Sequence, residues 1–429
     1  MKSLEKHLYE IYSGGWPVIH WKSLALLERL ATLISGLWAI PAVLLIRCLH
    51  PWRIIRFGPI STSRIGDFAI EASQKWAMTQ RQSKIYLDLY WFKHKPVCNE
   101  FWARVVQRNF HVSALIRPLD MWNQILPGGA LHHLSIHDPS FRDIHGYYEQ
   151  NAVRMEFLPE EDTWAKSWLH QQGWQEGDPF VCLLVRDSSY LDNTYPNTDP
   201  SHGLGIHYDP KLGYGWNHLN YRDSDIATYV PAMEWLANQG VWVLRMGKIM
   251  ANPIPSNHTH IIDYAFDPDK SDFLDIWLFA HCDLCISTGT GIDTISDSYR
   301  KPILFLNFMP LREMFSWSNA MHLPKNLIWN ASGTPLNLRE QFNDFGEYYD
   351  RNGIRIINLA PEEILEAVQE RWQRIQGTWI DTEEDLKRNS RFWEILKTLP
   401  DFYQNHGWIH PEARVGAIWL RSKGDDYLK

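Results

Sequence analysis

The sequence predicts an α/β protein in which two parallel-sheet domains face each other across a cleft. A chain of 429 residues is longer than one hydrophobic core usually organises, so about two domains with extensions are expected. Short apolar runs alternate with helical segments in two successive sets, which is typical of parallel sheets joined by helices. The hydrophobic content of 45% and charged content of 21% indicate a folded globular chain.

The N-terminal segment, residues 1–52, contains an uncharged apolar run at residues 30–46, LATLISGLWAIPAVLLI. As a helix this run would span about 25 Å, less than the roughly 30 Å hydrocarbon core of a bilayer, and Pro41 is expected to interrupt it. The long segment before the run does not fit a cleaved signal peptide. We therefore expect a peripheral or monotopic membrane anchor, and the alternative is a helix buried in the core.

The first domain, residues 53–170, opens with a βα unit. A strand at residues 54–57 leads through a Gly/Ser/Thr loop into a helix that starts near Gly66 and Asp67. Apolar and amphipathic segments then continue to alternate. They predict strands at residues 84–91 and 113–120 and helices at residues 101–110 and 164–170.

The second domain, residues 171–379, alternates more clearly, and residues 380–429 are expected to form a helical extension. Its first strand, at residues 179–186, is almost wholly apolar, as strands buried on both faces of a parallel sheet are. A polar loop of about thirty residues follows, far longer than most strand–helix connections. Further strands are predicted at residues 241–247, 261–265, 283–287 and 302–307, helices at 226–240 and 273–282, and one more strand and helix within 353–373.

Composition argues against several classes of function. The net charge of −8 and the absence of a basic run do not favour nucleic-acid binding. Five scattered cysteines fit a reducing compartment, and the single Cys282-x-x-Cys285 pair is a poor metal or redox site because positions i and i+3 of a strand point to opposite faces. The 22 Trp residues offer flat faces that suit the C–H faces of sugar rings, although core packing explains most of them.

Polar residues follow four predicted strands, at the strand ends where parallel sheets bind ligands. They are Arg186-Asp187, Arg245-Met246-Gly247, Asp263-Tyr264 and the glycine loop Ser287-Thr288-Gly289-Thr290-Gly291. Glycines permit close backbone approach, N–H groups before a helix attract anions, and guanidinium groups suit phosphate, so we expect a diphosphate here. The alternatives are a routine glycine turn, since the loop matches no complete phosphate-binding motif, and surface ion pairs for the arginines.

Two stretches of the second domain, HLNYRDSDIATYVPAMEWLANQGVWVLRMG and CDLCISTGTGIDTISDSYRKPILFLN, resemble the GT-B glycosyltransferases of bacterial surface-polysaccharide clusters. The resemblance covers residues 53–379 and is more specific in the second domain than in the first. It implies two Rossmann-like domains, with a nucleotide-sugar donor bound to the C-terminal one and an acceptor bound to the N-terminal one. The donor-binding residues it implies are Arg186, Arg245, Gly247, Asp263, Tyr264, Ser287, Thr288, Gly289, Thr290 and Gly291.

Residues SRIGDFA resemble the first βα turn of the lipopolysaccharide heptosyltransferases, in which the aspartate serves as a base. This resemblance implies Asp67 as the catalytic base. An equally ordinary role for an aspartate in the first turn is to satisfy the N-terminus of the helix. Histidines in polar stretches are the reserve candidates for the base: His132, His133, His137, His145 and His218.

Asp223-Ser224-Asp225 has the spacing of a metal-binding D-x-D motif, but it stands directly before a predicted helix. Asp and Ser at such positions cap free N–H groups and interact favourably with the helix dipole. We therefore expect caps rather than metal ligands. Arginines and helix ends can neutralise a leaving diphosphate without a cation.

Taken together, these patterns predict a metal-independent glycosyltransferase, without a cofactor, on the cytoplasmic face of the inner membrane. It would transfer a sugar from a nucleoside-diphosphate-sugar donor to a polysaccharide or lipid-linked glycan acceptor, with residues 30–46 on the membrane surface. Two alternatives stay open. One is a transferase of the same fold that uses another activated donor, such as a pyruvyl transferase, and the other is a non-catalytic carbohydrate-binding or scaffold protein.

Overall fold

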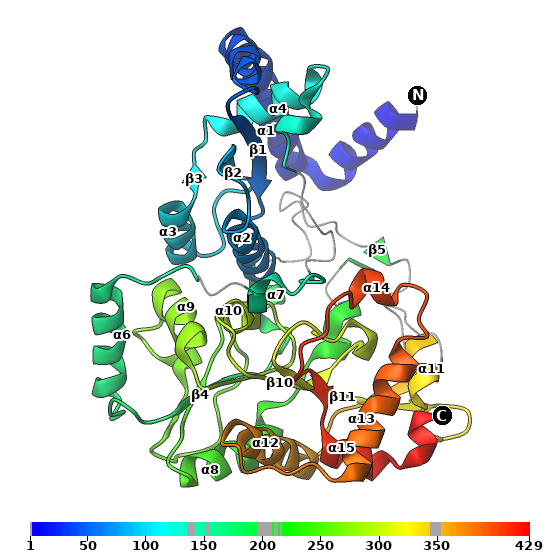
Figure 1. Cartoon of the computed structure of the whole chain (residues 1–429). Coiled ribbons are helices and arrows are strands. Elements are labelled where there is room, and N and C mark those ends of the chain that lie inside the picture. The colour runs from blue at the N-terminus through cyan, green and yellow to red at the C-terminus, as the bar shows by residue number, and fades with distance from the viewer. Residues whose placement is uncertain are drawn as a thin grey trace.

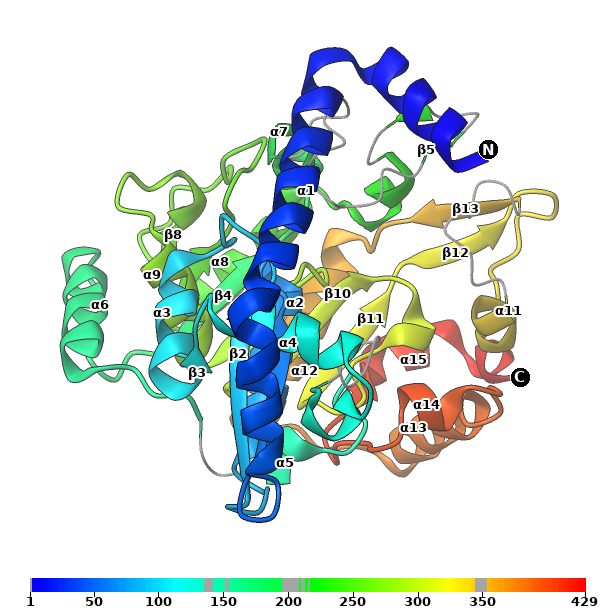
Figure 2. The same ribbon diagram turned by 90° about the horizontal axis from the view of Figure 1, so that it is seen from above.

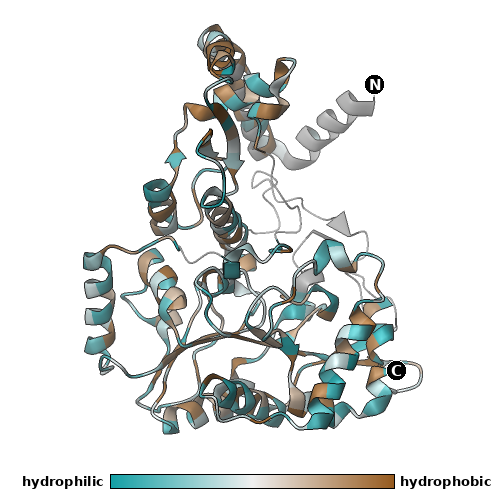
Figure 3. Ribbon diagram, in the orientation of Figure 1, coloured by the Kyte–Doolittle hydropathy of each residue, from teal (hydrophilic) through white to brown (hydrophobic). Residues whose placement is uncertain are grey.

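The computed structural model describes residues 2–134, 142–150, 154–194, 208–209, 213–214, 217–343 and 353–429. Two parallel sheets surrounded by helices form most of the molecule, so the predicted α/β class with parallel sheets is confirmed (Figure 1). In the view of Figure 1, the smaller, N-terminal sheet stands above the larger one. Figure 3 shows apolar strands between helices whose outer faces are polar.

The smaller sheet has three parallel strands in the order β1 (Ile54–Ile60), β2 (Tyr86–Phe92) and β3 (His111–Val112). Helix α2 (Ile65–Thr79) follows β1, and α3 (Glu100–Asn109) follows β2. The Asn99 side chain accepts a hydrogen bond from the Trp102 backbone N–H and so caps α3, as expected for Asn at this position. The predicted first βα unit is therefore present.

The strand predicted at residues 113–120 is wrong, because this segment enters helix α4 (Ile116–Ile125). Its buried residues, Ile116, Asp120 and Asn123, recur at helical spacing. Pro118 lies in the first turn, where its missing N–H costs no hydrogen bond. Only the two residues of β3 pair with the sheet.

The larger sheet has seven parallel strands in the order β14-β11-β10-β9-β4-β7-β8. Its central strands β4, β7, β9 and β10 are buried along their whole length, as the apolar runs predict. The strand order reverses at β4, because later strands add first on the β7 side and then on the β9 side. The bounds are β4 (Phe180–Leu184), β7 (Trp242–Arg245), β8 (Ile261–Ile262), β9 (Leu284–Ser287), β10 (Ile303–Phe308), β11 (Ala320–Pro324) and β14 (Arg414–Val415).

One predicted strand forms outside this sheet. Strand β13 (Ile354–Ile357) pairs antiparallel with β12 (Asn326–Trp329) as a separate ribbon. Only one residue of β13 is buried, whereas every residue of β11, which has the place beside β10, is buried. A half-exposed strand suits a two-stranded ribbon better than the interior of a parallel sheet. Strand β14 comes from residues 380–429, which were expected to be helical.

Helices cover both faces of the larger sheet. Helices α9 and α10 lie on the face toward the small sheet, whereas α8 and α12 lie on the opposite face (Figure 1). Helix α10 also contacts α2, which brings the two sheet units together. The bounds of these and the remaining helices are α5 (Tyr147–Gln150), α6 (Pro159–Gln171), α7 (Ser189–Thr194), α8 (Val230–Asn238), α9 (Asp272–His281), α10 (Asp293–Ser298), α11 (Leu338–Asn343), α12 (Pro361–Ile375), α13 (Glu383–Leu396), α14 (Phe402–Asn405) and α15 (Ala417–Lys423).

Helix α1 (Lys2–Cys48) is kinked at Gly15, where φ is +59°, and its longer part after the kink contains the apolar run and crosses the molecule beside α4 (Figure 2). It comes close to α4 at Gly36, because a Cβ added there would lie 2.5 Å from the Trp122 ring. The expected interruption at Pro41 is wrong, because the helix continues through this exposed proline, where water can satisfy the carbonyl group that loses its partner.

Most of the large side chains of the apolar run face outward. Leu33, Ile34 and Leu45 are exposed, and Leu37 is 84% exposed, so the run is not a buried core helix. Within the described residues, no helix is long and apolar enough to cross a membrane. The exposed apolar surface of α1 is therefore extensive.

Candidate active-site cleft

A cleft of about 350 Å³ lies between the two sheet units, where β1 of the small sheet and β4, β7 and β9 of the large sheet end. The reversal of strand order at β4 places this cleft at the topological switch point of the large sheet, where open α/β sheets bind ligands. Five of the predicted site residues line it: Asp67, Arg186, Gly247, Thr290 and Gly291.

The two sheet units meet at a pair of glycines. A Cβ added to Gly66, at the start of α2, would lie 2.8 Å from the Cα of Gly291 in the glycine loop. Gly291 has a φ of +84°, which side chains rarely adopt. The contact therefore requires glycine at position 66, and the backbone conformation favours glycine at position 291. The same contact sets Asp67 beside the glycine loop.

A buried carboxylate holds the glycine loop in shape. Asp293, in the first turn of α10, accepts hydrogen bonds from the Ser287 hydroxyl at 2.7 Å and from the Thr290 N–H at 2.9 Å. The Gly289 N–H donates to the Ser287 hydroxyl at 3.0 Å. Burial raises the pKa of Asp293. The N–H groups of Gly289 and Thr290 are therefore already paired and do not contribute to anion binding in the cleft.

The predicted loop residues thus divide into two groups. Thr290 and Gly291 line the cleft, whereas Ser287, Thr288 and Gly289 lie behind it and support the loop. The Thr288 hydroxyl accepts a hydrogen bond from the Arg186 backbone N–H at 3.0 Å, which ties the ends of β9 and β4 together. The buried Thr290 hydroxyl has no hydrogen-bond partner among the described residues, which is unusual for a buried polar group.

Arg64 lines the cleft from the small sheet unit, and two arginines of the large sheet unit bring further positive charge to it. Arg186 follows β4, lies 3.5 Å from a carboxylate oxygen of Asp223, and has a pKa lowered to about 10, first by burial and then by the nearby charge of Arg222. Arg222 lines the same cleft and donates a hydrogen bond to the Gly289 carbonyl. Two guanidinium groups that line one cleft would both be stabilised by an anion bound between them. Sequence reasoning missed Arg222, although it directly precedes Asp223.

Arg245, Asp263 and Tyr264 were predicted to bind the donor, but the structure does not bring them to the cleft wall. The Arg245 side chain is 1% exposed and donates hydrogen bonds to Asp263 and to the Asn252 carbonyl, both at 3.0 Å. Tyr264 is buried behind the cleft. At this strand end, Gly247 and the unpredicted Lys248 line the cleft instead.

Asp67 lies in the first turn of α2 and lines the cleft, but it does not cap the helix. No side chain caps this helix N-terminus, and the Asp67 carboxylate accepts no hydrogen bond from the described residues. Burial raises its pKa, and the charge of Arg64 opposes that shift. A second carboxyl group of the cleft, Asp275, is also buried, and its pKa is raised to about 6, mainly by this burial.

The three reserve histidines whose side chains the structure describes do not line the cleft. The His132 ring lies 2.6 Å from the Ile55 carbonyl, and His133 lies 3.1 Å from Asp120. His145 is exposed and its ring lies against Tyr147. The remaining two fall outside what the structure describes, His137 entirely and His218 in its side chain.

The Asp223-Ser224-Asp225 triplet supplies one helix cap and one ion pair. Asp225 accepts a hydrogen bond from the Ala227 N–H at 3.0 Å and caps a short 3-10 helix, Ile226–Tyr229. Asp223 instead faces Arg186, and burial raises the pKa of Asp223 to about 6. Among the described residues, no group of three or more His, Cys, Asp and Glu residues is placed to hold a metal ion.

No family model matches the sequence, and no curated protein matches it. One similar solved structure is a family 9 glycosyl transferase from Veillonella parvula, 10% identical over 75% of this chain and 98% of that chain, with a TM-score of 0.42. Another is the ADP-heptose lipopolysaccharide heptosyltransferase II of E. coli, which is 11% identical over 75% of this chain and 100% of that chain, with a TM-score of 0.39. A third is the E. coli heptosyltransferase WaaC with ADP, which is 12% identical over 63% of this chain and 91% of that chain, with a TM-score of 0.28. With TM-scores below 0.5, these similarities do not decide what this chain does.

Proposed function

We propose that this chain is a GT-B glycosyltransferase that transfers a sugar from a nucleoside diphosphate to a polysaccharide or lipid-linked glycan in surface-polysaccharide biosynthesis. One observation carries the proposal: Asp67, whose carboxylate accepts no hydrogen bond within the described part of the chain, shares a cleft with two neighbouring guanidinium groups, Arg186 and Arg222. These groups come from opposite sheet units. Proton abstraction on one side and anion stabilisation on the other are what a displacement at a sugar carbon requires.

In the proposed reaction, an acceptor hydroxyl group attacks the sugar carbon that carries the diphosphate. The hydroxyl proton passes to the Asp67 carboxylate as the new C–O bond forms. The bond from the sugar carbon to the diphosphate oxygen breaks, and the negative charge that develops on the leaving diphosphate is stabilised by Arg186 and Arg222. Asp223 keeps the Arg186 side chain in place until the donor binds.

We also propose that α1 attaches the enzyme to the cytoplasmic face of the inner membrane. Its outward side chains, such as Leu33, Leu37 and Leu45, offer apolar surface that water does not favour. Arg47, at the end of this helix, donates hydrogen bonds to Asn123 and to the Pro127 carbonyl, so α1 is fastened to the acceptor-side sheet unit. Membrane attachment would therefore orient the acceptor side of the cleft toward a lipid-linked substrate.

A thermal-shift screen tests the donor class. The panel contains nucleoside diphosphates, nucleotide sugars and phosphoenolpyruvate, and a ligand at about 100 times its Kd adds ~2.7 kcal/mol to the free energy of unfolding. We expect a nucleoside diphosphate and its sugar derivative to raise Tm. Stabilisation by phosphoenolpyruvate alone would favour a pyruvyl-type transferase, and no stabilisation by any compound would favour a non-catalytic scaffold.

A further inference from the structure

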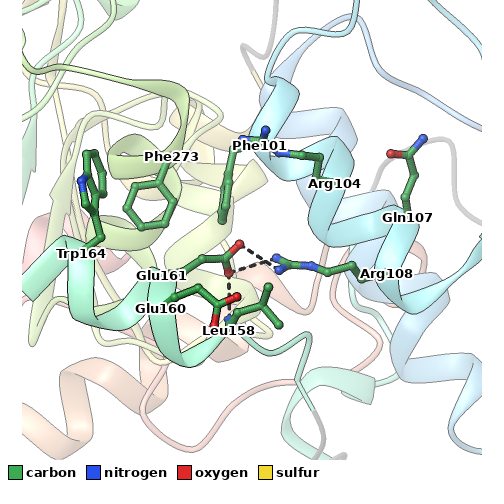
Figure 4. A pocket seen from close by; sticks show the side chains of 9 residues that line it. All are labelled: Phe101, Arg104, Gln107, Arg108, Leu158, Glu160, Glu161, Trp164 and Phe273. Atoms are coloured by element: carbon green, nitrogen blue, oxygen red, sulfur yellow. Dashed lines mark hydrogen bonds and ion pairs between the residues drawn. The ribbon is translucent and has the colours of Figure 1, made fainter.

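A second hollow, which we call the aromatic groove, lies outside the cleft between α3, α6 and the start of α9 (Figure 4). Its volume is about 740 Å³, within the range of small-ligand sites. It joins the two sheet units, because α3 belongs to the small sheet and α9 covers the large one. It is lined by Phe101, Arg104, Gln107, Arg108, Leu158, Glu160, Glu161, Trp164 and Phe273.

Three aromatic rings form a row along one side of this groove (Figure 4). The Phe273 ring makes edge contacts with Phe101, at 4.7 Å between ring centroids, and with Trp164, at 4.8 Å. Phe101 is buried, but the Trp164 side chain is 49% exposed. The row therefore ends in a large flat indole that has apolar surface available to a ligand.

Polar groups of both kinds line the other side. Arg108 and Glu161 are already paired through two hydrogen bonds of 2.8 and 3.1 Å. By contrast, the side chains of Arg104, Gln107 and Glu160 make no hydrogen bond with any residue that the structure describes, although the Arg104 guanidinium lies 5.6 Å from the centroid of the Phe101 ring. These three groups offer donors and acceptors at the same site, and the two arginines of the groove are balanced by its two glutamates.

The aromatic groove shares a wall with the cleft. Asn99 and Lys248 line the cleft, and both contact Asp272, which also accepts a hydrogen bond from the Glu100 N–H at 2.8 Å. The residues that follow on each chain segment, Phe101 and Phe273, line the groove. A chain molecule whose end lies in the cleft could therefore pass over this wall into the groove.

We propose that the aromatic groove binds a neutral oligosaccharide, namely the part of the glycan acceptor that extends away from the reacting hydroxyl group. This inference rests on the proposed glycosyltransferase function. The exposed indole suits the C–H face of a sugar ring, and neighbouring donors and acceptors suit its hydroxyl groups. The balanced charges of the groove give no preference to an anionic polymer, and its polar side distinguishes it from a site for a purely apolar partner.

Saturation-transfer NMR titration of the full chain tests the proposal. The probes are neutral cello-, malto-, xylo- and manno-oligosaccharides, with oligogalacturonate as the acidic comparison. We expect at least one neutral probe to bind, and Trp164→Ala to weaken it by about tenfold, which corresponds to about 1.4 kcal/mol. Trp164→Phe should retain most of the affinity because it keeps a ring. Tyr403→Ala, which removes a 77% exposed aromatic side chain of α14 far from the groove, is the matched control and should change nothing.

Nucleoside-diphosphate binding, measured on the same samples, separates this inference from the proposed function. If a nucleotide binds but no neutral probe does, or if Trp164→Ala leaves the neutral probe unaffected, the groove is not a glycan site although the enzyme assignment stands. If Trp164→Ala abolishes glycan binding and no nucleotide binds, the groove is a glycan site on a non-catalytic protein. Tighter binding of oligogalacturonate than of every neutral probe would overturn the neutral ligand class.

Discussion

The two sheet units differ in what they present to the cleft and to the outside. The three-stranded unit supplies the cleft with Asp67, a carboxylate that accepts no hydrogen bond from the described residues, and it carries the exposed apolar helix α1 on its outer side. The seven-stranded unit buries its central strands completely and supplies Arg186 and Arg222, which are held by an ion pair and a backbone hydrogen bond. A rigid sheet with fixed charges suits a diphosphate, whereas one carboxylate with space around it suits an acceptor that must enter and leave.

The largest effect that this difference predicts is for Asp67→Asn. Asparagine keeps the size of the side chain but cannot accept the proton, so turnover should fall about 10²–10⁴-fold while nucleotide affinity stays close to normal. Transfer kinetics and nucleotide titration on the same variant measure both quantities. Turnover that is nearly intact would remove Asp67 as the base, and Asp275 would be the next residue to test because it lines the cleft whereas the described histidines do not.

The next effect concerns the arginines of the large sheet unit. Arg186→Ala and Arg222→Ala should each weaken nucleotide binding by about 1.5–3 kcal/mol, the usual worth of a hydrogen bond to a charged group. Arg245→Ala is the matched comparison: Arg245 is buried against Asp263, so its removal should lower Tm and leave nucleotide affinity nearly unchanged. Calorimetry and thermal unfolding distinguish the two results. If only Arg245→Ala weakens nucleotide binding, the donor binds near Asp263 and not beside Arg186 and Arg222.

The outer surface of the small sheet unit gives a third prediction. Removal of residues 1–52 should release the protein from anionic vesicles and leave a folded chain, because the apolar run precedes β1. The double variant Leu37→Glu with Leu45→Glu should also weaken vesicle binding without loss of the helix, since both side chains are exposed. Vesicle co-sedimentation and circular dichroism check both. A truncated chain that is unfolded, together with a double variant that still binds, would show that α1 serves the fold alone.

A smaller effect concerns stability and pH. Because burial raises the folded-state pKa of Asp67, its neutral form is favoured on folding, and the stability that this provides is lost as the pH rises through that pKa. Asp67→Asn should therefore be at least as stable as the parent protein at neutral pH. The difference should disappear below the unfolded-state pKa, about 3.9. Urea unfolding over a pH series measures it, and a variant that is less stable at neutral pH would indicate that the carboxylate supports the fold.

The smallest expected effect is that of chelation. Asp225 caps a helix and Asp223 faces Arg186, so EDTA should leave turnover unchanged. Loss of activity that Mn²⁺ or Mg²⁺ restores would assign the triplet to a metal. It would also show that a cation, and not the two arginines, stabilises the leaving diphosphate.

Much of the fold could be predicted because the signals are local. The almost wholly apolar run at residues 179–186 forms β4 as predicted, and the predicted loop Ser287 to Gly291 follows its neighbour β9. The strand predicted at residues 113–120 instead enters helix α4, which packs against α1. A period of two or of 3.6 residues cannot be distinguished in so few positions.

The composition of the site depended on tertiary structure. Arg186 and Arg245 both stand at strand ends and are equivalent in the sequence, yet one lines the cleft and the other is buried against Asp263. Arg222 enters the cleft from a distant segment, and the Gly66–Gly291 contact joins the two sheet units. Periodicity and turn chemistry depend on neighbours along the chain and can be read from it. Whether two charged side chains reach the same cavity depends instead on how segments distant in the sequence pack together. No short stretch of the sequence shows that packing.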